Sequence, residues 1–181
     1  MHIQKRPLQT TNWVGGTTSE WFIFPEESSY QERNFLIRIS TATVDQSPSD
    51  FTKLPDFDRK LLMLSGEGVL NLNQATIHLS ADKFIHFKGK DEVQSIGQFT
   101  DFNVIHHPTV HVETVSISLK GVQNITRKGC QLFLWLKSGS LTLDNILIES
   151  HQGVCLPDQN DLKISGEAEV ILVYFVKNTL G

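Results

Sequence analysis

The stretch LLMLSGEGVLNLN at residues 61–73 decides the fold of this chain, because a similar stretch, LFLWLKSGSLTLD, returns at residues 132–144. The two stretches lie 71 positions apart, their apolar residues coincide, and Gly68 aligns with Gly139. Apolar and β-branched runs that are interrupted by glycine are typical of paired strands. We interpret each copy as a strand, a glycine turn and a second strand, and the pair as an internal repeat.

A second pair of stretches supports the repeat. IHFKGKDEV at residues 85–93 matches LKISGEAEV at residues 162–170 with a shift of 77, so the second half has a loop six residues longer. Chance similarity between two β-hairpins is the alternative, but the same order of elements in both halves favours duplication. We expect an N-terminal arm and first half over residues 1–110, and a second half over 111–181, in one compact unit.

Short β-rich runs recur along the chain, whereas no window of about twelve residues has a helical period. Polar residues and a proline suggest a short helix or turn at residues 49–58. The regular spacing of the runs predicts an all-β sandwich or barrel. The eleven runs cover residues 35–44, 61–64, 69–72, 76–79, 84–88, 93–96, 99–105, 111–119, 131–136, 140–148 and 169–176.

Composition excludes several kinds of partner. The chain has 181 residues and a net charge of -4, and no run of Lys or Arg exceeds two residues, which argues against nucleic-acid binding. The longest apolar run, residues 170–176, is too short to cross a membrane. The basic N-terminus has no apolar stretch behind it, and there are only two cysteines. We therefore expect a cytoplasmic protein without a membrane partner.

Metal and nucleophile signatures are absent from the sequence. There is no His-x-His pair, and only His106, His107 and His111 cluster. Adjacent strand residues face opposite ways, so His106 and His107 cannot both enter one barrel, and Pro108 interrupts the strand between His107 and His111. There is also no Gly-x-Ser-x-Gly elbow and no phosphate-binding loop. We expect no metal, no cofactor and no catalytic residue.

Arg38 is the sharpest candidate for binding. On the predicted strand at residues 35–44 it shares a face with Ser40, between Leu36 and Ala42. A charge on such a face needs an anionic partner, because an unpaired buried charge is costly. That partner is either an internal carboxylate or the carboxylate of a ligand, and a guanidinium suits both.

A second polar face lies on the run at residues 99–105. Asp101 and Asn103 alternate with apolar residues and share one side of the strand. Asp101 is a candidate internal partner of Arg38, with Asn103 as a neutral donor and acceptor; a solvent-exposed face is the alternative. Arg59 is a third polar candidate, or pairs locally with the acidic segment at residues 56–58.

The N-terminal segment WVGGTTSE at residues 13–20 is a further candidate. Gly15 and Gly16 allow the backbone to approach another surface closely. Trp13 supplies a flat apolar wall, and Thr18 supplies a hydroxyl. The segment is either a lid or rim over a pocket, or a tight turn that pins the arm to the barrel.

Taken together, these stretches resemble the HutD/Ves family of cupin-like proteins. The resemblance rests on residues 13–20, RISTATV at 38–44, FDRKLLMLSGEG at 57–68, FKG at 87–89 and DFNV at 101–104. It implies a bicupin, two fused antiparallel β-sandwich or barrel halves of the double-stranded β-helix type, without the usual cupin metal ligands. The first motif departs from the commoner Asn-Gly-Gly-Gly form. Carried over by position, the ligand-binding residues are Trp13, Gly15, Gly16, Thr18, Arg38, Ser40, Arg59, Asp101 and Asn103.

The resemblance also implies a function. We expect a non-catalytic protein that binds or senses a small carboxylate-bearing metabolite, such as N-formylglutamate, in histidine utilisation or a stress response. One alternative is a metal-dependent oxygenase or an isomerase that uses His106, His107 or His111 with Asp101. Another is a structural or oligomeric module, since cupin halves pair through sheet edges and a homodimer is plausible.

Overall fold

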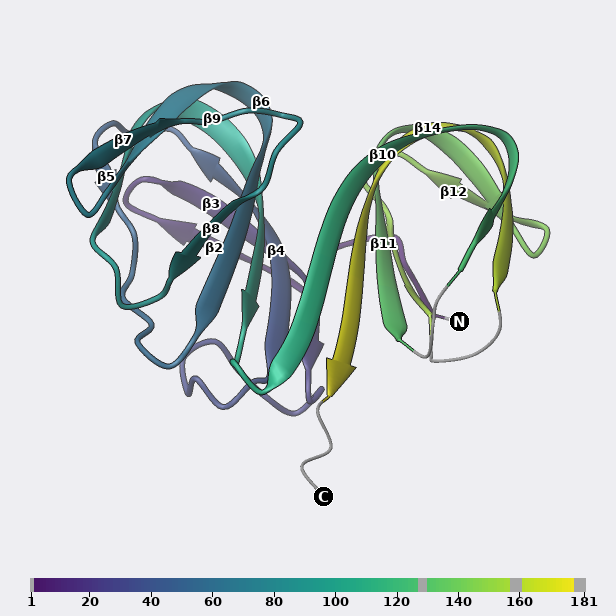
Figure 1. The fold of residues 1–181 in the computed structure, drawn as a ribbon, viewed down its shortest axis with the longest axis horizontal. Helices are drawn as coiled ribbons and strands as arrows, with labels where there is room; N and C mark the ends of the chain where they lie inside the picture. The colour runs from purple at the N-terminus through teal and green to yellow at the C-terminus, as the bar shows by residue number, and fades with distance from the viewer. Residues whose placement is uncertain (1, 127–129, 157–160, 178–181) are drawn as a thin grey trace. The chain divides into compact units, whose positions relative to one another are not determined.

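The computed structural model describes residues 2–126, 130–156 and 161–177. Among these residues there is no helix, and the strands form two antiparallel sheets (Figure 1). The described part of the chain therefore has no helix that is long and apolar enough to cross a membrane. The predicted all-β, antiparallel architecture is confirmed. Residues 49–58, where a short helix or turn was expected, contain no helix but a turn at residues 55–56.

One compact unit comprises residues 7–109. Its strands follow the order β2-β3-β4-β9-β6-β7, β5 pairs with β9, β8 pairs with β6, and the sheet curls on itself (Figure 1). The strands are β2 (Gln9–Trp13), β3 (Gly16–Phe24), β4 (Ile37–Val44), β5 (Ser49–Asp50), β6 (Asp58–Leu72), β7 (Ala75–His78), β8 (Ile85–Lys88) and β9 (Val93–His106).

The other unit combines the segment up to Arg6 with the chain from Val110 onward. Its strands follow the order β1-β13-β11-β14-β10, and β12 pairs with β11. The N-terminal strand pairs with β13, although the first six residues were expected to belong to the first half. The strands are β1 (His2–Gln4), β10 (Val110–Ile125), β11 (Gln131–Leu143), β12 (Ile146–Glu149), β13 (Gly153–Leu156) and β14 (Leu162–Lys177).

The two copies of the first repeat do occupy equivalent places. β6 turns into β7 through Asn73 and Gln74, and β11 turns into β12 through Asp144 and Asn145. All four turn residues have positive φ, between 47° and 73°, which suits a two-residue hairpin loop. The shift of 71 positions therefore aligns two real hairpins.

The glycine turn predicted inside each copy is wrong. β6 and β11 run through Gly68 and Gly139 without turning. Each strand instead has a register shift, between Met63 and Ser65 in β6 and between Leu136 and Ser138 in β11. A bulge of this kind bends a strand and leaves it continuous, so the predicted runs at 61–64 and 69–72 are one strand.

The second stretch of the repeat was aligned incorrectly. β8 pairs with the beginning of β6, and β13 takes the same place beside β11. β9 and β14 are likewise equivalent, because each pairs along the whole length of β6 or β11. The shift of 77 therefore matched β8 with β14. The error arose because the four-residue strand β13 was not predicted, and β1, β2 and β3 were missed as well.

The two units differ in whether they bury polar side chains. The core of the unit that contains β10 to β14 is built from apolar residues such as Leu134, Ile148 and Val170. Burying polar groups is costly unless they are hydrogen-bonded, so their location marks a candidate site. Among the described residues, all the buried polar or charged side chains lie in the unit of residues 7–109: Glu20, Arg38, Ser40, Arg59, Ser95, Asp101, Asn103 and His106.

Candidate ligand-binding pocket

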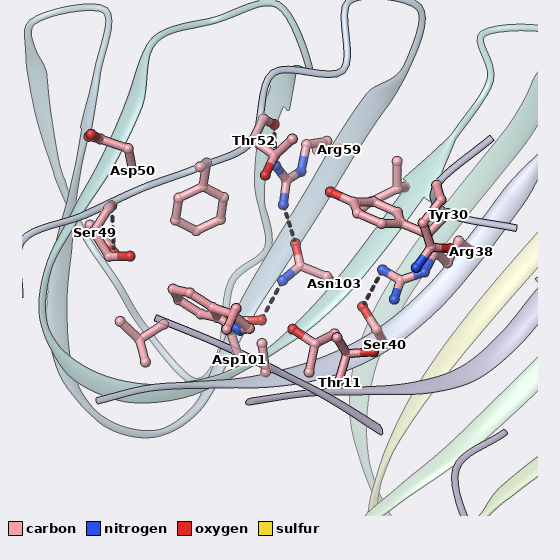
Figure 2. Close-up of a pocket in the computed structure, with 18 of the residues that line it drawn as sticks. Thr11, Tyr30, Arg38, Ser40, Ser49, Asp50, Thr52, Arg59, Asp101 and Asn103 are labelled. Carbon is pink, nitrogen blue, oxygen red and sulfur yellow. Dashed lines mark hydrogen bonds between the residues drawn. The ribbon is translucent and has the colours of Figure 1, made fainter. Parts of the chain in front are cut away.

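A cavity of about 260 Å³ lies inside the unit of residues 7–109 (Figure 2). Its wall combines residues of β2, β3, β4, β5, β6 and β9 with the segment around Tyr30. Of the nine residues predicted to bind a ligand, the glycines Gly15 and Gly16 do not line it. The other seven do: Trp13, Thr18, Arg38, Ser40, Arg59, Asp101 and Asn103.

Strand register explains why residues far apart in sequence meet here. β9 lies between β4 and β6, so that Ile105 stands opposite both Arg38 and Arg59. Two residues further along each of these strands, on the same face, Asn103 of β9 stands opposite Ser40 of β4. Because alternate residues share a face, Asp101 and Asn103 enter the same cavity. Their exposed fractions are 1% and 5%, so the alternative of a solvent-exposed face is wrong.

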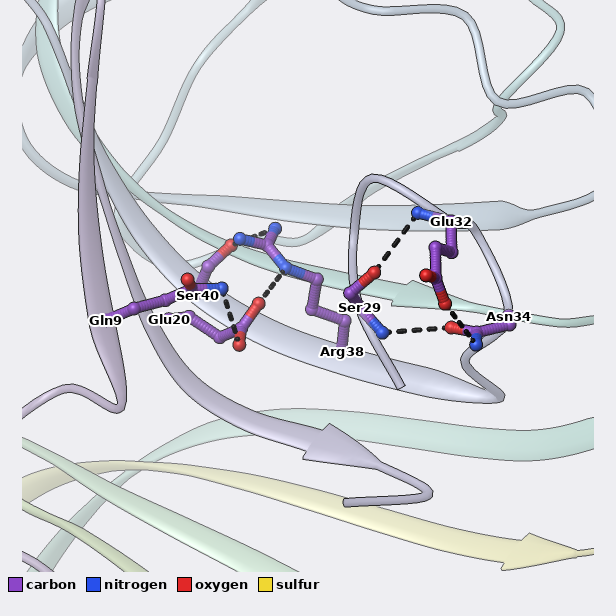
Figure 3. Close-up of polar contacts among 7 residues, drawn as sticks. All are labelled: Gln9, Glu20, Ser29, Glu32, Asn34, Arg38 and Ser40. Atoms are coloured by element: carbon purple, nitrogen blue, oxygen red, sulfur yellow. Dashed lines mark hydrogen bonds and ion pairs between the residues drawn. The ribbon is translucent and has the colours of Figure 1, made fainter. Parts of the chain in front are cut away.

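Arg38 has an internal carboxylate partner, and it is Glu20. Nε of Arg38 donates to Oε2 of Glu20 at 2.5 Å, and Nη1 donates to Oγ of Ser40 at 3.3 Å (Figure 3). Gln9 donates to the other oxygen of Glu20 at 3.1 Å. The candidate pairing of Arg38 with Asp101 is therefore wrong. Glu20 was missed because its strand, β3, was not predicted.

The guanidinium of Arg38 is also covered by an aromatic ring. Its Cζ lies 4.5 Å from the centroid of the Tyr30 ring, a cation–π distance. The segment that carries Tyr30 is held by Asn34, whose Oδ1 accepts from the backbone N–H of Ser29 at 2.9 Å and whose Nδ2 donates to Glu32 at 2.9 Å (Figure 3). Local hydrogen bonds thus fix the ring that closes this side of the cavity.

Arg59 is placed differently, because it meets a neutral amide and two rings. Nη2 donates to Oδ1 of Asn103 at 3.3 Å, and Nη1 reaches the carbonyl of Thr52 at 3.5 Å (Figure 2). Its Cζ lies 4.8 Å from the Phe51 ring centroid and 5.2 Å from that of Phe87. Its buried Nε meets no hydrogen-bond acceptor among the described residues.

The charge of Arg59 persists at neutral pH. Burial lowers its pKa to about 10, and Arg38 acts in the same direction. Tyr30 and Asp101 oppose this change. A buried cation without a hydrogen-bonded carboxylate partner among the described residues therefore lines the cavity.

Asp101 carries a strongly perturbed carboxyl group. Burial raises its pKa to about 7, and this outweighs the lowering by Arg59 and by the hydrogen bond from Asn103. In that hydrogen bond Nδ2 of Asn103 donates to Oδ1 of Asp101. The raised pKa leaves part of this carboxyl protonated near neutral pH, so it does not fully offset the charge of Arg59.

The tip of the β2–β3 hairpin is both a pinned turn and part of the rim. A Cβ on Gly15 would lie 2.0 Å from the Trp13 ring, and one on Gly16 would lie 1.8 Å from the carbonyl oxygen of Thr43. The carbonyl of Gly15 accepts from the backbone N–H of Asp45 at 2.8 Å. Trp13 is 39% exposed and lines the cavity, and the absence of a side chain at Gly15 leaves room for its ring there.

Several lining residues were not predicted. Ser95 is fully buried, and its hydroxyl donates to the carbonyl of Ser49 at 3.2 Å. Its odd position on β9, shared with Asp101 and Asn103, was the signal that could have found it. Phe51 and Tyr30 had no such signal, because they lie in irregular segments whose path depends on tertiary packing.

The clustered histidines do not line the cavity. Nδ1 of His107 lies 2.7 Å from Oγ1 of Thr109, and Nε2 of His111 lies 3.2 Å from a carboxylate oxygen of Glu113. Within the described ranges, no group of three or more His, Cys, Asp or Glu side chains is arranged to hold a metal ion. The polar groups of the cavity suit the binding of an organic anion.

Solved structures match this fold over nearly its whole length. The conserved protein of unknown function PA5104 from Pseudomonas aeruginosa PAO1 is 20% identical, with 96% of this chain and 97% of that chain covered and a TM-score of 0.83. HutD from Pseudomonas fluorescens SBW25 is 18% identical, with 98% of both chains covered and a TM-score of 0.82. The bacterial pirin YhhW from Escherichia coli, in complex with nickel(II), is 12% identical, with 96% and 97% covered and a TM-score of 0.73. These likenesses show that the chain has the fold of cupin- and pirin-like β-proteins.

The family follows from the sequence itself. The family model HutD matches residues 5–173, and the chain belongs to the HutD family. The predicted family and the predicted cupin-like fold are both confirmed. The name of the family links it to histidine utilisation. No curated protein matches the chain in sequence.

Proposed function

We propose that this chain binds a small carboxylate-bearing metabolite in the cavity of residues 7–109, as a non-catalytic binding or regulatory protein of histidine utilisation. The observation that carries the proposal is the buried guanidinium of Arg59, which lines the cavity and, among the described residues, is hydrogen-bonded to the neutral amide of Asn103 and not to a carboxylate. Leaving a buried charged donor unsatisfied is costly, and a carboxylate is its natural acceptor.

The two arginines have different roles in this proposal. Arg38 already has a carboxylate partner in Glu20, so its charge is offset within the protein. Arg59 contacts the neutral amide of Asn103, and its charge stays available to a ligand. An anion that enters the cavity therefore gains most beside Arg59.

The cavity also limits the size of the ligand. Its volume of about 260 Å³ is below the roughly 300–1,000 Å³ typical of sites for drug-sized molecules. A small acid of a few carbon atoms fits this volume, whereas a nucleotide does not. The half-exposed ring of Trp13 at the rim offers an apolar surface to the remainder of such a ligand.

The probes follow from the family. N-formyl-L-glutamate is the first, because the family is linked by name to histidine utilisation. Formate is the second, because the solved structure of HutD from Pseudomonas fluorescens is that of a formate condition. Formamide, which is neutral and of similar size, is the matched control for formate. Thermal shift and isothermal titration calorimetry measure binding, and mass spectrometry of the recovered probes shows whether they are altered.

We expect the two acids to raise the melting temperature in a concentration-dependent way, and formamide to leave it unchanged. Arg59→Gln and Arg59→Lys should each weaken binding roughly 10- to 150-fold, because each removes the planar guanidinium, which can bind a carboxylate in two places. Arg33→Gln, at an exposed arginine outside the cavity, is the control. Equal affinity of the Arg59 variants and the unchanged protein contradicts the assigned anchor, and conversion of a probe contradicts the non-catalytic role.

A further inference from the structure

We propose that anion binding in this cavity is coupled to a proton, so that a carboxylate held by Arg59 enters together with one proton that is taken up by Asp101. This inference rests on the proposed function, and it adds a regulation of the same site. The bound complex then has the charge of the undissociated acid. Affinity should consequently respond to pH even though the ligand itself does not titrate in the relevant range.

The orientation of the Asn103 amide is the first step of the argument. A guanidinium can only donate hydrogen bonds, so the group of Asn103 that faces Nη2 of Arg59 must be its carbonyl oxygen Oδ1. The amide nitrogen Nδ2 must then face Asp101, and it donates to Oδ1 of that carboxyl (Figure 2). One carboxyl oxygen is therefore committed as an acceptor. The proton belongs on the other oxygen, Oδ2.

Strand register keeps Asp101 from forming a close ion pair with Arg59. On β6 and β9, Arg59 stands opposite Ile105, whereas Asp101 stands opposite Met63. Four positions separate these two places, which is about 13 Å along a strand. Asn103 fills the gap between the two charged groups. The carboxyl is thus buried beside an amide, and burial raises its pKa to about 7.

The charged surroundings determine what a ligand would do. Arg38 and Glu20 form a closed ion pair, so they add little net charge. A bound carboxylate places a negative charge in the cavity that Asp101 also lines, and it occupies donors of Arg59. Both changes favour the protonated carboxyl. The charged or titratable groups around the cavity are Arg59 from β6, Arg38 from β4, Glu20 from β3, Asp50 from β5 and Tyr30 from the segment between β3 and β4.

The sign of the pH dependence follows directly. Below pH 7 the carboxyl of Asp101 already carries its proton in the free protein, so binding takes up little. Above pH 7 the free protein has lost this proton, and the complex must recover it from solution. The dissociation constant should therefore rise between pH 7.5 and 9, by up to about tenfold per pH unit.

The test is calorimetry with N-formyl-L-glutamate, whose carboxylates are fully ionised throughout this range. At pH 8 the apparent binding enthalpies in HEPES and in Tris should differ by the difference between the ionisation enthalpies of the two buffers, multiplied by the number of protons taken up, which should be about one. Asp101→Asn should still bind the probe, with no pH slope and no proton uptake. Asp56→Asn, at an exposed aspartate outside the cavity, should keep the pH dependence of binding and the proton uptake of the unchanged protein.

A second measurement uses the unchanged protein, so it does not depend on whether a variant folds. In protein labelled with ¹³C at the aspartate carboxyl carbons, one resonance should titrate near pH 7, and its midpoint should rise by more than one pH unit when N-formyl-L-glutamate is bound. Binding with a constant dissociation constant and no proton uptake overturns the coupling alone. Failure of N-formyl-L-glutamate and of formate to bind at any pH overturns the proposed function and the coupling with it.

Discussion

Nε of Arg38 and Oε2 of Glu20 lie 2.5 Å apart, on side chains that are only 8% and 4% exposed. The pair joins β4 to β3 through a contact between residues 18 positions apart. Removing one partner of a buried ion pair leaves the other charge without compensation, which costs more than the pair itself contributes. This relationship makes Glu20 the structural partner of Arg38, which lines the cavity.

Glu20→Gln should therefore lower the free energy of unfolding by about 3–5 kcal/mol. Urea denaturation at pH 7 measures the change. The control is Glu92→Gln, which removes the exposed pair between Lys53 and Glu92 and should cost less than about 1 kcal/mol. Equal effects of the two substitutions would show that the buried pair is no more important than a surface pair.

Asp101 should make the stability of the protein depend on pH. Its folded pKa of about 7 is above the ordinary value of 3.8, so the folded chain binds more protons than the unfolded chain between these values. The free energy of unfolding should fall as pH rises through this window and level off above pH 7. Asp101→Asn should remove this contribution and gain on the order of a few kcal/mol relative to the unchanged protein at pH 8.

Denaturation curves of both proteins at several pH values between 4 and 8 measure this difference. An amide at position 101 still accepts the hydrogen bond from Asn103, so the comparison isolates the titration. A difference in stability that stays constant across this range would contradict the raised pKa.

Gly16 should tolerate no side chain. It has a φ of 154°, and a Cβ at this position would lie 1.8 Å from the carbonyl oxygen of Thr43 on the neighbouring strand. Gly16→Ala should cost about 3 kcal/mol or more, because backbone atoms must move. Gly121→Ala is the control, since Gly121 has a φ of 75° but nothing within 4 Å of its Cβ position. That substitution should cost about 1–2 kcal/mol, and thermal unfolding measures both.

Tryptophan fluorescence should report ligand binding from a single site. Trp13 is 39% exposed and lines the cavity, whereas Trp21 and Trp135 are 7% and 2% exposed and do not. Adding N-formyl-L-glutamate should therefore change the fluorescence of the protein, and Trp13→Phe should abolish this change. A change that persists in this variant would place the response outside the rim of the cavity.

The sequence predicted the faces of strands better than their connections. The alternation around Arg38 and around Asp101 placed both side chains in the cavity correctly, because a period of two depends only on local geometry. The partner of Arg38 could not be found this way. Glu20 lies on β3, and its strand offered no regular alternation, since its register shifts between Glu20 and Phe22.

The internal repeat shows a similar limit. The two copies were matched through their apolar residues, but their two-residue turns were not predicted, and the predicted run at 140–148 passes through the turn at Asp144 and Asn145. The bulges near Met63 and Leu136 leave no local pattern, so a glycine inside a continuous strand was interpreted as a turn. Whether a strand bends or ends is decided by its partner strand, which the local sequence does not specify.

The confinement of buried polar residues to one unit has a consequence for how this chain can change over time. An interior such as that around Leu134 and Val170 accepts only exchanges between apolar side chains of similar volume. The unit of residues 7–109 instead carries the energetic cost of burying Arg59 and Asp101, and an exchange at either position changes the chemistry of its cavity. Substitutions can therefore change the polar chemistry of one unit while the apolar core of the other keeps its packing.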